Sequence, residues 1–343
     1  MIRVAIAGAS GYTGAELIRL LSRHPAVELV RLAAGEQAGR ILRAVHPQFR
    51  GTEIGERTLV QSDWGALAED VEVAFLALPH GHALDAVPRL LARGCRVIDL
   101  GADFRLRDPE AYRHWYRLDH TASDLLHEAV YGLPELHRAL ITEARLVANP
   151  GCYPTAAALA LLPLLPHAGA GTLVIDAKSG VSGAGRKATL EHAFTEVAES
   201  LRPYGVLEHR HTPEIAQIVA AAGAPRRVIF TPHLIPMTRG ILATCYVPLE
   251  EPPQDLHALF VERYRGEPFV AVLDAAELPA TGVVRGSNRC DVAVRWDPES
   301  RVAVAFGAID NLVKGAAGQA VQNLNLMFGL DERAGLESTP LSP

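Results

Sequence analysis

Residues 2–21, IRVAIAGASGYTGAELIRLL, decide the fold of the first half of the chain. Ile2–Ala7 is a short apolar run that stops at Gly8, and apolar residues then recur at helical spacing over residues 15–21. This order predicts a strand, a tight turn and a helix. Three further strand-like runs and one helix-like run follow, at residues 28–34, 71–78, 85–94 and 95–101. The alternation is typical of a parallel sheet covered by helices.

The turn after the first strand has the spacing GxxGxxG, a variant of the dinucleotide-binding fingerprint. Glycine lets the backbone approach a pyrophosphate, and the amides at the start of the following helix attract its charge. The alternative is a tight strand-to-helix turn with no ligand. After the second predicted strand, Glu36 suits a ribose hydroxyl and Arg40 suits a phosphate, so the residues there favour neither form of the cofactor. The predicted cofactor-binding residues of the turn are Gly8, Ser10, Gly11, Tyr12, Thr13 and Gly14.

Length and composition narrow the class of protein. The chain has 343 residues, enough for about two domains. Its net charge of −6 arises from mixed signs without a basic block, so we expect neither a nucleic-acid partner nor an anionic membrane. No apolar run approaches the roughly 18 residues of a membrane span. The four cysteines are irregularly spaced with no CxxC pair, so the sequence suggests neither a disulfide framework nor a cysteine zinc site, and we expect a cytoplasmic protein. The charge pattern makes small-molecule chemistry the default expectation.

The second half of the chain has a different pattern. Strand-like runs crowd together with few helices between them, at residues 228–232, 240–249, 290–297 and 301–310. They predict a largely antiparallel or mixed sheet. The expected fold is therefore α/β, with an N-terminal doubly wound parallel sheet and a second α+β domain with a large mixed sheet. We expect residues 1–150 and 315–343 to form the first domain, because a helix predicted at 315–327 packs back on it, and residues 151–314 to form the second.

Cys152 is the candidate nucleophile. The segment VANPGCYPT, residues 147–155, places it where a predicted strand ends and a helix begins. A helix N-terminus stabilises anionic sulfur and lowers the pKa of a thiol. The same first-turn amides, helped by Asn149, are expected to hold the oxygen of a tetrahedral intermediate. The alternative is a buried cysteine that fills space. That interpretation is kept for Cys95, Cys245 and Cys290, which lie in or beside apolar runs.

These segments resemble the N-acetyl-gamma-glutamyl-phosphate reductase family of arginine biosynthesis. VANPGCYPTAAALALLP is similar to the active-site segment of that family, and GASGYTGAELIRLL is similar to its cofactor turn. The resemblance extends almost from end to end. It includes HPQFRG from His46, ALPHG from Ala77, DLGADFRL from Asp99, YGLPEL from Tyr131, SGVSGAGR from Ser179, HRHTPEI from His209, PHLIPMTRGIL from Pro232 and DNLVKGAAGQAVQN from Asp310.

The resemblance implies a Rossmann domain followed by a catalytic and oligomerisation domain of glyceraldehyde-phosphate-dehydrogenase-like type, as in the related aspartate-semialdehyde dehydrogenases. It implies that the cysteine attacks an acyl phosphate, that phosphate leaves, and that NADPH, with NAD as the weaker alternative, reduces the thioester to a semialdehyde. It also implies a homotetramer. Pro79 is expected beside the cofactor, and Asn311 is expected at its nicotinamide side or as the cap of the last helix.

Reduction of a thioester needs a general acid, and His209 and His211 are the candidates. Two residues apart in an extended segment they share a face. His211 is preferred, and the alternative is that both are surface histidines before a helix at Pro213.

The phosphate and carboxylate of the substrate need fixed cations. The candidates are Arg105, Arg186, Arg210 and, first among them, Arg239. The alternative for Arg239 is an ordinary surface ion pair. The turn at Ser182 and Gly183 offers backbone amides to an anion, unless it is only a flexible surface turn.

Three other functions compete with this interpretation. A metallohydrolase would draw ligands from His80, His82 and Asp85 or from His209, His211 and Glu214. The HxHxxD spacing of the first set is not the tighter HxHxD of metallohydrolases, and Pro79-His80 is expected where the cofactor passes, so we expect no metal. A non-catalytic dinucleotide sensor would not need a cysteine at a helix mouth. A lysine-pathway reductase acting on a carrier-bound aminoadipyl phosphate differs in substrate by one methylene, which a binding pocket discriminates weakly. The run from Asn149 to Thr155 resembles the arginine-pathway type.

Overall fold

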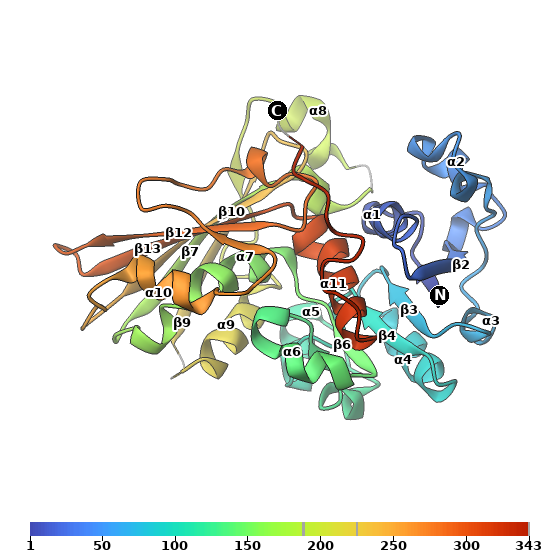
Figure 1. Cartoon of the computed structure of the whole chain (residues 1–343), viewed down its shortest axis with the longest axis horizontal. Coiled ribbons are helices and arrows are strands. Elements are labelled where there is room, and N and C mark those ends of the chain that lie inside the picture. The colour runs from blue at the N-terminus through green and yellow to red at the C-terminus, as the bar shows by residue number, and fades with distance from the viewer. Residues whose placement is uncertain (187–188, 224–225, 342–343) are drawn as a thin grey trace. The chain divides into compact units, whose positions relative to one another are not determined.

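The computed structural model describes residues 1–186, 189–223 and 226–341 (Figure 1). Contacts between residues divide the chain into two compact units. The N-terminal unit contains Met1–Pro150 and Ala316–Glu337. The C-terminal unit contains Gly151–Gly315 and the described part of the tail from Ser338 onwards.

A six-stranded sheet forms the centre of the N-terminal unit. Its strand order is β2-β1-β3-β4-β6-β5, and every neighbouring pair is parallel. The central strands β1, β3 and β6 are almost wholly apolar and buried, as expected for a parallel sheet covered on both faces. The strands are β1 (Ile2–Ala7), β2 (Val27–Ala33), β3 (Val73–Leu76), β4 (Arg96–Asp99), β5 (Val130–Tyr131) and β6 (Leu146–Ala148).

Helices between the strands cover this sheet. They are α1 (Tyr12–Leu21), α2 (Leu42–Val45), α3 (Trp64–Ala68), α4 (Ala83–Ala92), α5 (Pro109–Tyr116), α6 (Pro134–Glu143) and, from the end of the chain, α11 (Gly318–Met327). The last helix packs against α1 and α6 of the same unit. It begins later than the sequence pattern predicts, because residues Val313–Ala317 form a π-helical turn first.

The strand order reverses between β1 and β3, and the glycine-rich turn lies at this switch point, where doubly wound sheets bind ligands. Gly8 has φ +86°, and a Cβ on it would lie 2.1 Å from the carbonyl oxygen of Ala77. A Cβ on Gly14 would lie 2.2 Å from the carbonyl oxygen of Gly8. Gly11 differs, since a Cβ there would meet only the Gly8 oxygen, at 3.5 Å. The fold itself therefore requires glycine at positions 8 and 14 but not at position 11.

A mixed seven-stranded sheet forms the C-terminal unit, in the order β11-β12-β13-β10-β7-β9-β8. Two pairs, β11 with β12 and β7 with β9, are parallel, and the others are antiparallel. The strands are β7 (Thr172–Gly180), β8 (Arg202–Pro203), β9 (Arg227–Ile235), β10 (Ile241–Pro248), β11 (Val270–Val272), β12 (Cys290–Asp297) and β13 (Val302–Ile309). The predicted fold class, a parallel sheet followed by a large mixed sheet, is confirmed.

The core of the C-terminal unit lies between this sheet and α7 (Cys152–Leu161), which is apolar on all sides and buried after its first residue. α7 packs on β10, β12 and β13 and on α9 (Thr212–Ala221). Gly307 of β13 permits the close approach, because a Cβ on it would lie 2.4 Å from the carbonyl oxygen of Ala156. The other helices are α8 (Phe194–Val197) and α10 (Leu256–Arg263).

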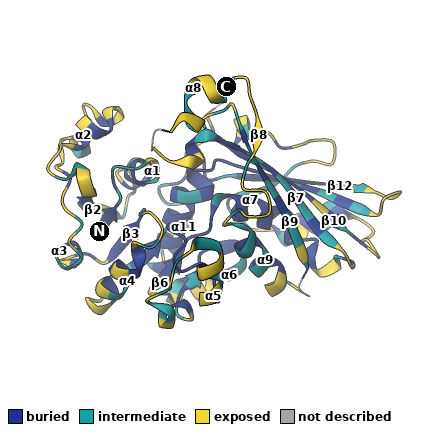
Figure 2. Cartoon of the chain, turned by 180° about the vertical axis from the view of Figure 1, so that it is seen from behind, coloured by how far each residue is buried: buried dark blue, intermediate teal, exposed yellow. Residues whose placement is uncertain are grey.

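The two faces of the mixed sheet are buried to different extents. A cross-strand row on the α7 side, Phe230, Ile175, Cys245 and Ala305, is fully buried. The row on the opposite side, Ile229, Val174, Tyr246 and Val304, remains partly exposed. Figure 2 shows buried and intermediate stretches alternating along the strands of this sheet. Within the described ranges, no helix combines the length and apolarity needed to cross a bilayer.

We predict that Gly307→Ala destabilises the protein by about 1–3 kcal/mol, the usual cost of adding atoms to a packed core. The free energy of unfolding, measured by urea denaturation, checks this. Gly282→Ala is the matched control, because a Cβ there would have no atom within 4 Å. Equal stability of the two variants would contradict the close packing of α7 on β13.

Candidate active site

Cys152 is the first residue of α7 and is partly exposed, with Gly151 as the extended N-cap residue before it. Cys95, Cys245 and Cys290 are buried. Burial raises the pKa of the Cys95 thiol to about 12 and also raises the pKa of Cys245. Only Cys152, among the four cysteines, combines access to solvent with a position at a helix N-terminus.

Two side chains from the start of α9 converge on Gly151. The Glu214 carboxylate is fully buried and accepts a hydrogen bond from the Gly151 N–H at 2.8 Å. The imidazole of His211 lies against the Gly151 Cα, because a Cβ there would come within 2.5 Å of Nε2. His211 therefore presents Nε2 next to the residue that precedes the cysteine, and glycine at position 151 makes room for it.

His209 has a different environment from His211. Its Nδ1 accepts a hydrogen bond from the His211 backbone N–H at 3.1 Å, so Nδ1 carries no proton. The ring packs edge-on against Tyr153, Tyr204 and Phe230. Burial, and then the charge of Arg210, lower the pKa of His209 to about 4. His209 is consequently neutral at physiological pH.

The expectation of an extended segment at these histidines is wrong. Residues 205–211 form turns, and His211 already has helical backbone angles as the N-cap of α9. The two rings therefore pack against each other, with centroids 4.9 Å apart. The turn arises because the short helix α9 must begin immediately beneath α7 to place Ile215 and Glu214 in the core.

Two tyrosine hydroxyls form a chain beside the cysteine. Tyr204 donates to the Tyr153 hydroxyl at 2.9 Å, and the Tyr153 hydroxyl lies 3.4 Å from the carbonyl oxygen of His233. Burial, with the nearby Cys152 sulfur, raises the pKa of Tyr204 to about 12 and raises that of Tyr153 further. Both hydroxyls stay protonated and act as donors.

The predicted residues Ser182, Gly183 and Asn311 lie together. The Asn311 carboxamide accepts from the Gly240 N–H at 2.8 Å and donates to the Ser182 hydroxyl at 3.0 Å. A Cβ on Gly183 would lie 3.7 Å from the same carboxamide. Asn311 does not cap the following turn, since Asp310 accepts from the Leu312 N–H instead. The turn after Asp310 reaches the cysteine, because a Cβ on Gly315 would lie 2.8 Å from the Cys152 Cβ.

The four predicted arginines differ in their surroundings. Arg239 forms an ion pair with the fully buried Asp310, at 3.5 Å, and remains partly exposed. Arg186 and Arg210 are exposed. Arg105, in the N-terminal unit, is buried and donates to the backbone carbonyls of Asn149 and Leu100. Arg239 is thus a cation held by a buried carboxylate with its outer face accessible.

Buried carboxylates organise the loops that follow β3 and β4 of the N-terminal unit. Asp103 accepts from the N–H groups of Gly81 and Ala83, which holds the loop that carries the exposed Pro79. Burial, with the adjacent Asp103, raises the pKa of Asp99 at the end of β4 to about 7. The predicted residue Asn149 is fully buried there.

Asn149 is held on both sides of its carboxamide. It donates to the Ala316 carbonyl at 3.1 Å and accepts from Asn323 at 3.1 Å. Its side chain thereby ties the end of β6 to the last helix of the N-terminal unit. Its role toward a substrate stays a prediction.

The charged residues after β2 lie at the surface, and the preference between NADP and NAD stays a prediction. Glu36 and Arg40 are both exposed, and Arg40 donates to Gln37 and to the Ala44 carbonyl. In the glycine-rich turn, Ser10, Gly11 and Thr13 are partly exposed and Tyr12 is exposed. The turn is therefore accessible to a ligand from its outer side.

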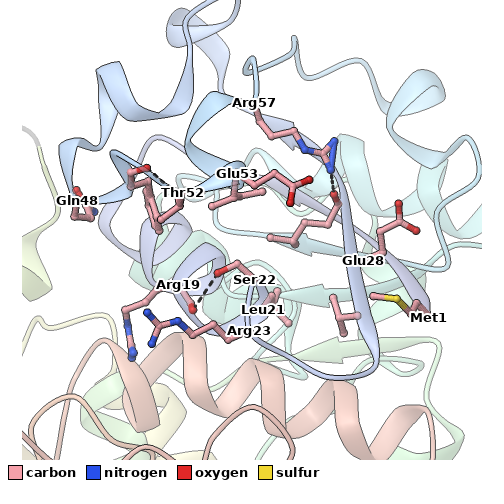
Figure 3. A pocket seen from close by; sticks show the side chains of 14 residues that line it. Met1, Arg19, Leu21, Ser22, Arg23, Glu28, Gln48, Thr52, Glu53 and Arg57 are labelled. Atoms are coloured by element: carbon pink, nitrogen blue, oxygen red, sulfur yellow. Dashed lines mark hydrogen bonds between the residues drawn. The ribbon is translucent and has the colours of Figure 1, made fainter.

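A cavity of about 580 Å³ lies elsewhere in the N-terminal unit, between the end of α1 and the start of β2 (Figure 3). Arg57 reaches across it to the Leu29 carbonyl, and the carboxylates of Glu28 and Glu53 point into it. It is at the opposite end of α1 from the glycine-rich turn, so it is not part of the candidate site. Across the described ranges, no three His, Cys, Asp or Glu side chains form a group that could hold a metal ion.

Comparison with known proteins assigns the family. Residues 3–144 match the model of the semialdehyde dehydrogenase NAD binding domain, and residues 152–311 match that of the semialdehyde dehydrogenase dimerisation domain. The chain is 52% identical over 349 residues to the N-acetyl-gamma-glutamyl-phosphate reductase of Desulforudis audaxviator, with all of both chains covered. The chain belongs to the N-acetyl-gamma-glutamyl-phosphate reductase family. The resemblance seen in the sequence is confirmed, and the family consists of oxidoreductase enzymes.

Solved structures of semialdehyde dehydrogenases share the fold. Aspartate semialdehyde dehydrogenase II of Vibrio cholerae superposes with a TM-score of 0.73 at 19% identity, covering 96% of this chain and 98% of that one. The Candida albicans enzyme, solved with NADP, gives a TM-score of 0.72 at 15% identity, covering 98% and 99%.

Three residues near Cys152 were not predicted from the sequence as part of its surroundings: Glu214, Tyr153 and Tyr204. Glu214 was considered only as a metal ligand. The sequence does contain a signal for the buried role of Glu214. This residue comes just before the buried Ile215, in the first turn of a predicted apolar helix, and a carboxylate buried there needs a hydrogen-bond donor. Nothing in the sequence pairs Tyr204 with Tyr153.

We predict that the low pKa of His209 makes the protein less stable in acid. As the pH falls, His209 binds a proton at a higher pH in the unfolded chain, where its pKa is near 6.5, than in the folded protein. The free energy of unfolding should therefore fall as the pH decreases from about 6.5 toward 4, and the His209→Gln variant should lose this part of the slope. Urea denaturation at a series of pH values measures both. Parallel slopes would show that His209 is not held neutral.

We predict that Gly11→Ala weakens dinucleotide binding while leaving the melting temperature nearly unchanged, because the fold has room for this Cβ but a pyrophosphate against the turn does not. Isothermal titration with NADPH and thermal unfolding measure the two effects. Gly14→Ala should instead lower the melting temperature. Unchanged affinity in Gly11→Ala would remove the turn from the cofactor site.

Proposed function

We propose that this protein reduces N-acetyl-gamma-glutamyl phosphate to N-acetylglutamate 5-semialdehyde with NADPH and releases phosphate, through a thioester on Cys152, in arginine biosynthesis. The observation that carries the proposal is the convergence of His211 and Glu214 on Gly151, at the helix mouth where Cys152 begins α7. In this proposal His211 is the proton donor and Cys152 the nucleophile at the same helix start. This arrangement supports covalent catalysis rather than a sensor that only binds a dinucleotide.

The Cys152 thiolate attacks the acyl carbon of the substrate, a carbon–sulfur bond forms, and the carbon–oxygen bond to phosphate breaks. The positive end of α7 stabilises the sulfur anion before the attack. Pro154 has no N–H, so Cys152 and Tyr153 carry the first-turn amides that face the oxyanion of the tetrahedral intermediate. Asn149 is proposed to support the same oxygen.

His211 is the proposed general acid and base. Its Nε2 gives a proton to the oxygen that becomes the hydroxyl of the hemithioacetal, and takes that proton back when the aldehyde leaves and the thiolate is restored. His209 acts as a positioning residue, because its neutral ring accepts the His211 N–H and fixes the backbone from which His211 extends. Glu214 fixes the start of α7, because its carboxylate accepts the hydrogen bond from the Gly151 N–H.

NADPH, when bound, supplies the hydride. The residues of the N-terminal unit fit a dinucleotide, since the turn at the switch point has positive φ at Gly8 and room above Gly11. We assign cofactor binding to Gly8, Ser10, Gly11, Tyr12, Thr13, Gly14 and Pro79, with Gly183 and Asn311 at the nicotinamide end. The NADP in the Candida albicans structure supports NADPH over NAD.

Arg239 is the proposed primary binding site for a substrate anion, because its guanidinium forms an ion pair with the buried Asp310 and its side chain remains partly exposed. Arg186, Arg210 and Arg105 are the further cations proposed for the phosphate and carboxylate. Ser182 is proposed as a further substrate-binding residue through its hydroxyl, which accepts a hydrogen bond from Asn311, while its N–H donates to the Thr238 carbonyl at 3.1 Å, next to Arg239.

We infer a homo-oligomer in the cytoplasm, built on the C-terminal unit. The row of Ile229, Val174, Tyr246 and Val304 on the mixed sheet is largely apolar and partly exposed among the residues that the structure describes. Such a face is suited to pairing with the same face of a second copy. The match of residues 152–311 to a dimerisation domain supports this assignment.

The test is a spectrophotometric assay of NADPH oxidation with N-acetyl-gamma-glutamyl phosphate and, for comparison, with aminoadipyl phosphate on its carrier. Cys152→Ala should abolish turnover and keep NADPH binding. His211→Asn should lower kcat by about 10²- to 10⁴-fold, whereas the exposed His167→Asn should leave it unchanged. Turnover by Cys152→Ala would overturn the thioester, and a higher kcat/KM on the carrier-bound substrate would reassign the pathway.

A further inference from the structure

The HPQFRG segment, residues 46–51, is distant from the glycine-rich turn in the chain but contacts it in the structure. His46 is buried, with only 4% of its surface exposed. Its Nε2 lies 3.0 Å from the carbonyl oxygen of Ala9, 37 residues earlier in the chain. A carbonyl oxygen can only accept a hydrogen bond, so Nε2 carries a proton and is the donor. A buried imidazole therefore holds the turn to which dinucleotide binding is assigned.

The backbone that carries His46 is itself fixed. The His46 N–H donates to the Leu42 carbonyl at 2.8 Å, and the His46 carbonyl accepts from the Phe49 N–H at 3.1 Å. Leu42 and Phe49 are buried, and the Phe49 ring packs edge-on against the imidazole with the ring centroids 6.3 Å apart. A Cβ on Gly55 would lie 2.0 Å from the Phe49 carbonyl oxygen, so the following turn packs tightly on the segment. The imidazole is therefore presented by a closely packed support.

Ala9 is held by three other parts of the N-terminal unit. Its N–H donates to the Ala33 carbonyl at 2.9 Å, and its carbonyl accepts from His46. The backbone of Gly14 in α1 lies against it, because a Cβ on Gly14 would come within 2.8 Å of the Ala9 Cα. Both polar groups of the Ala9 backbone are thus satisfied inside the protein, and the residue is fully buried.

The hydrogen bond from His46 sets the direction of the next peptide group. A trans peptide is planar, and its C=O and N–H point in opposite directions. Because the Ala9 carbonyl points at His46, the Ser10 N–H points away from His46. Ser10 and Gly11 are partly exposed at the start of α1, where backbone amides and the positive end of the helix attract phosphate groups. Rotation of this peptide would instead turn a carbonyl oxygen, which repels phosphate, to that side.

We propose that His46 is a positioning residue for the dinucleotide. Its Nε2–H holds the Ala9 carbonyl inside the protein, and the Ser10 amide is thereby presented to the pyrophosphate. The identity of the ligand rests on the proposed function, whereas the contact itself lies wholly within the N-terminal unit. Loss of the donor should let the peptide reorient and weaken cofactor binding, with no direct effect on the chemistry at Cys152.

The experiment compares variants of the full chain by isothermal titration with NADPH. In His46→Leu, which lacks the donor, the dissociation constant should rise by about 10-fold, the scale of one lost hydrogen bond to a buried carbonyl. His46→Gln places an amide N–H near the position of Nε2 and should restore most of the affinity. The matched control is His257→Leu in α10, because the His257 Nε2 bonds to the Leu273 carbonyl, also at 3.0 Å, in the C-terminal unit. The control should bind NADPH as the parent does.

Three results of this titration would contradict the assignment. Parental affinity in His46→Leu would show that the hydrogen bond does not serve the cofactor. A His46→Gln variant as weak as His46→Leu would show that packing of the ring is what matters, and not its donor. Absence of NADPH binding by the parent would overturn the proposed function, and the role of His46 with it.

Kinetics separate cofactor positioning from a merely structural role. In His46→Leu the KM for NADPH should rise by about 10-fold, whereas the KM for the acyl phosphate and kcat at saturating NADPH should stay close to the parental values. A fall in kcat with an unchanged KM for NADPH would refute the proposal.

A second pair of variants decides if His46→Leu fails to fold. His46→Gln and His46→Asn both keep a carboxamide, but the shorter asparagine does not reach the Ala9 carbonyl from the same backbone position. Weaker NADPH binding by His46→Asn than by His46→Gln supports the proposal, and equal binding by the two variants overturns it.

Discussion

The contact of His211 and Glu214 with Gly151 is the constraint on which the site depends. One side chain of α9 occupies the space that a Cβ at position 151 would fill, and another accepts the N–H of the same residue. The start of α7 is thereby fixed against the start of α9, and Cys152 is fixed with it. A buried carboxylate at a helix N-terminus is favourable in itself, since it meets both an unsatisfied amide and the positive end of the helix.

The two histidines show how burial separates identical side chains. His209 is enclosed by Tyr153, Tyr204 and Phe230, and its Nδ1 already accepts a hydrogen bond, so a proton on it would lose solvation and that bond together. Its neutral form is a rigid support. His211, two residues further along the chain, has its Nε2 against Gly151 at the start of α7. Both residues are histidines, so the different roles proposed for them follow from where each ring lies.

Three glycines allow segments of the protein to pack closely against one another. Gly307 allows α7 to pack closely on the mixed sheet, and Gly14 allows α1 to pack closely on the first turn. Gly315 allows the turn after Asp310 to approach Cys152. Each of these positions is filled by the protein itself. Gly11 is different, because a Cβ there would meet only the Gly8 carbonyl oxygen, at 3.5 Å, so the fold leaves room at this position.

The sequence by itself determined the order of strands and helices, the parallel and mixed sheets, the glycine-rich turn, and Cys152 at a helix start, because these follow from local periodicity and turn chemistry. It also determined the family, through motifs spread along the whole chain. Only the tertiary structure decided that Glu214 holds Gly151, that Tyr204 pairs with Tyr153, that Asp310 rather than Asn311 caps the last turn, and that His209 stays neutral. These depend on contacts between residues distant in the chain, and on the burial they produce, which no local pattern encodes.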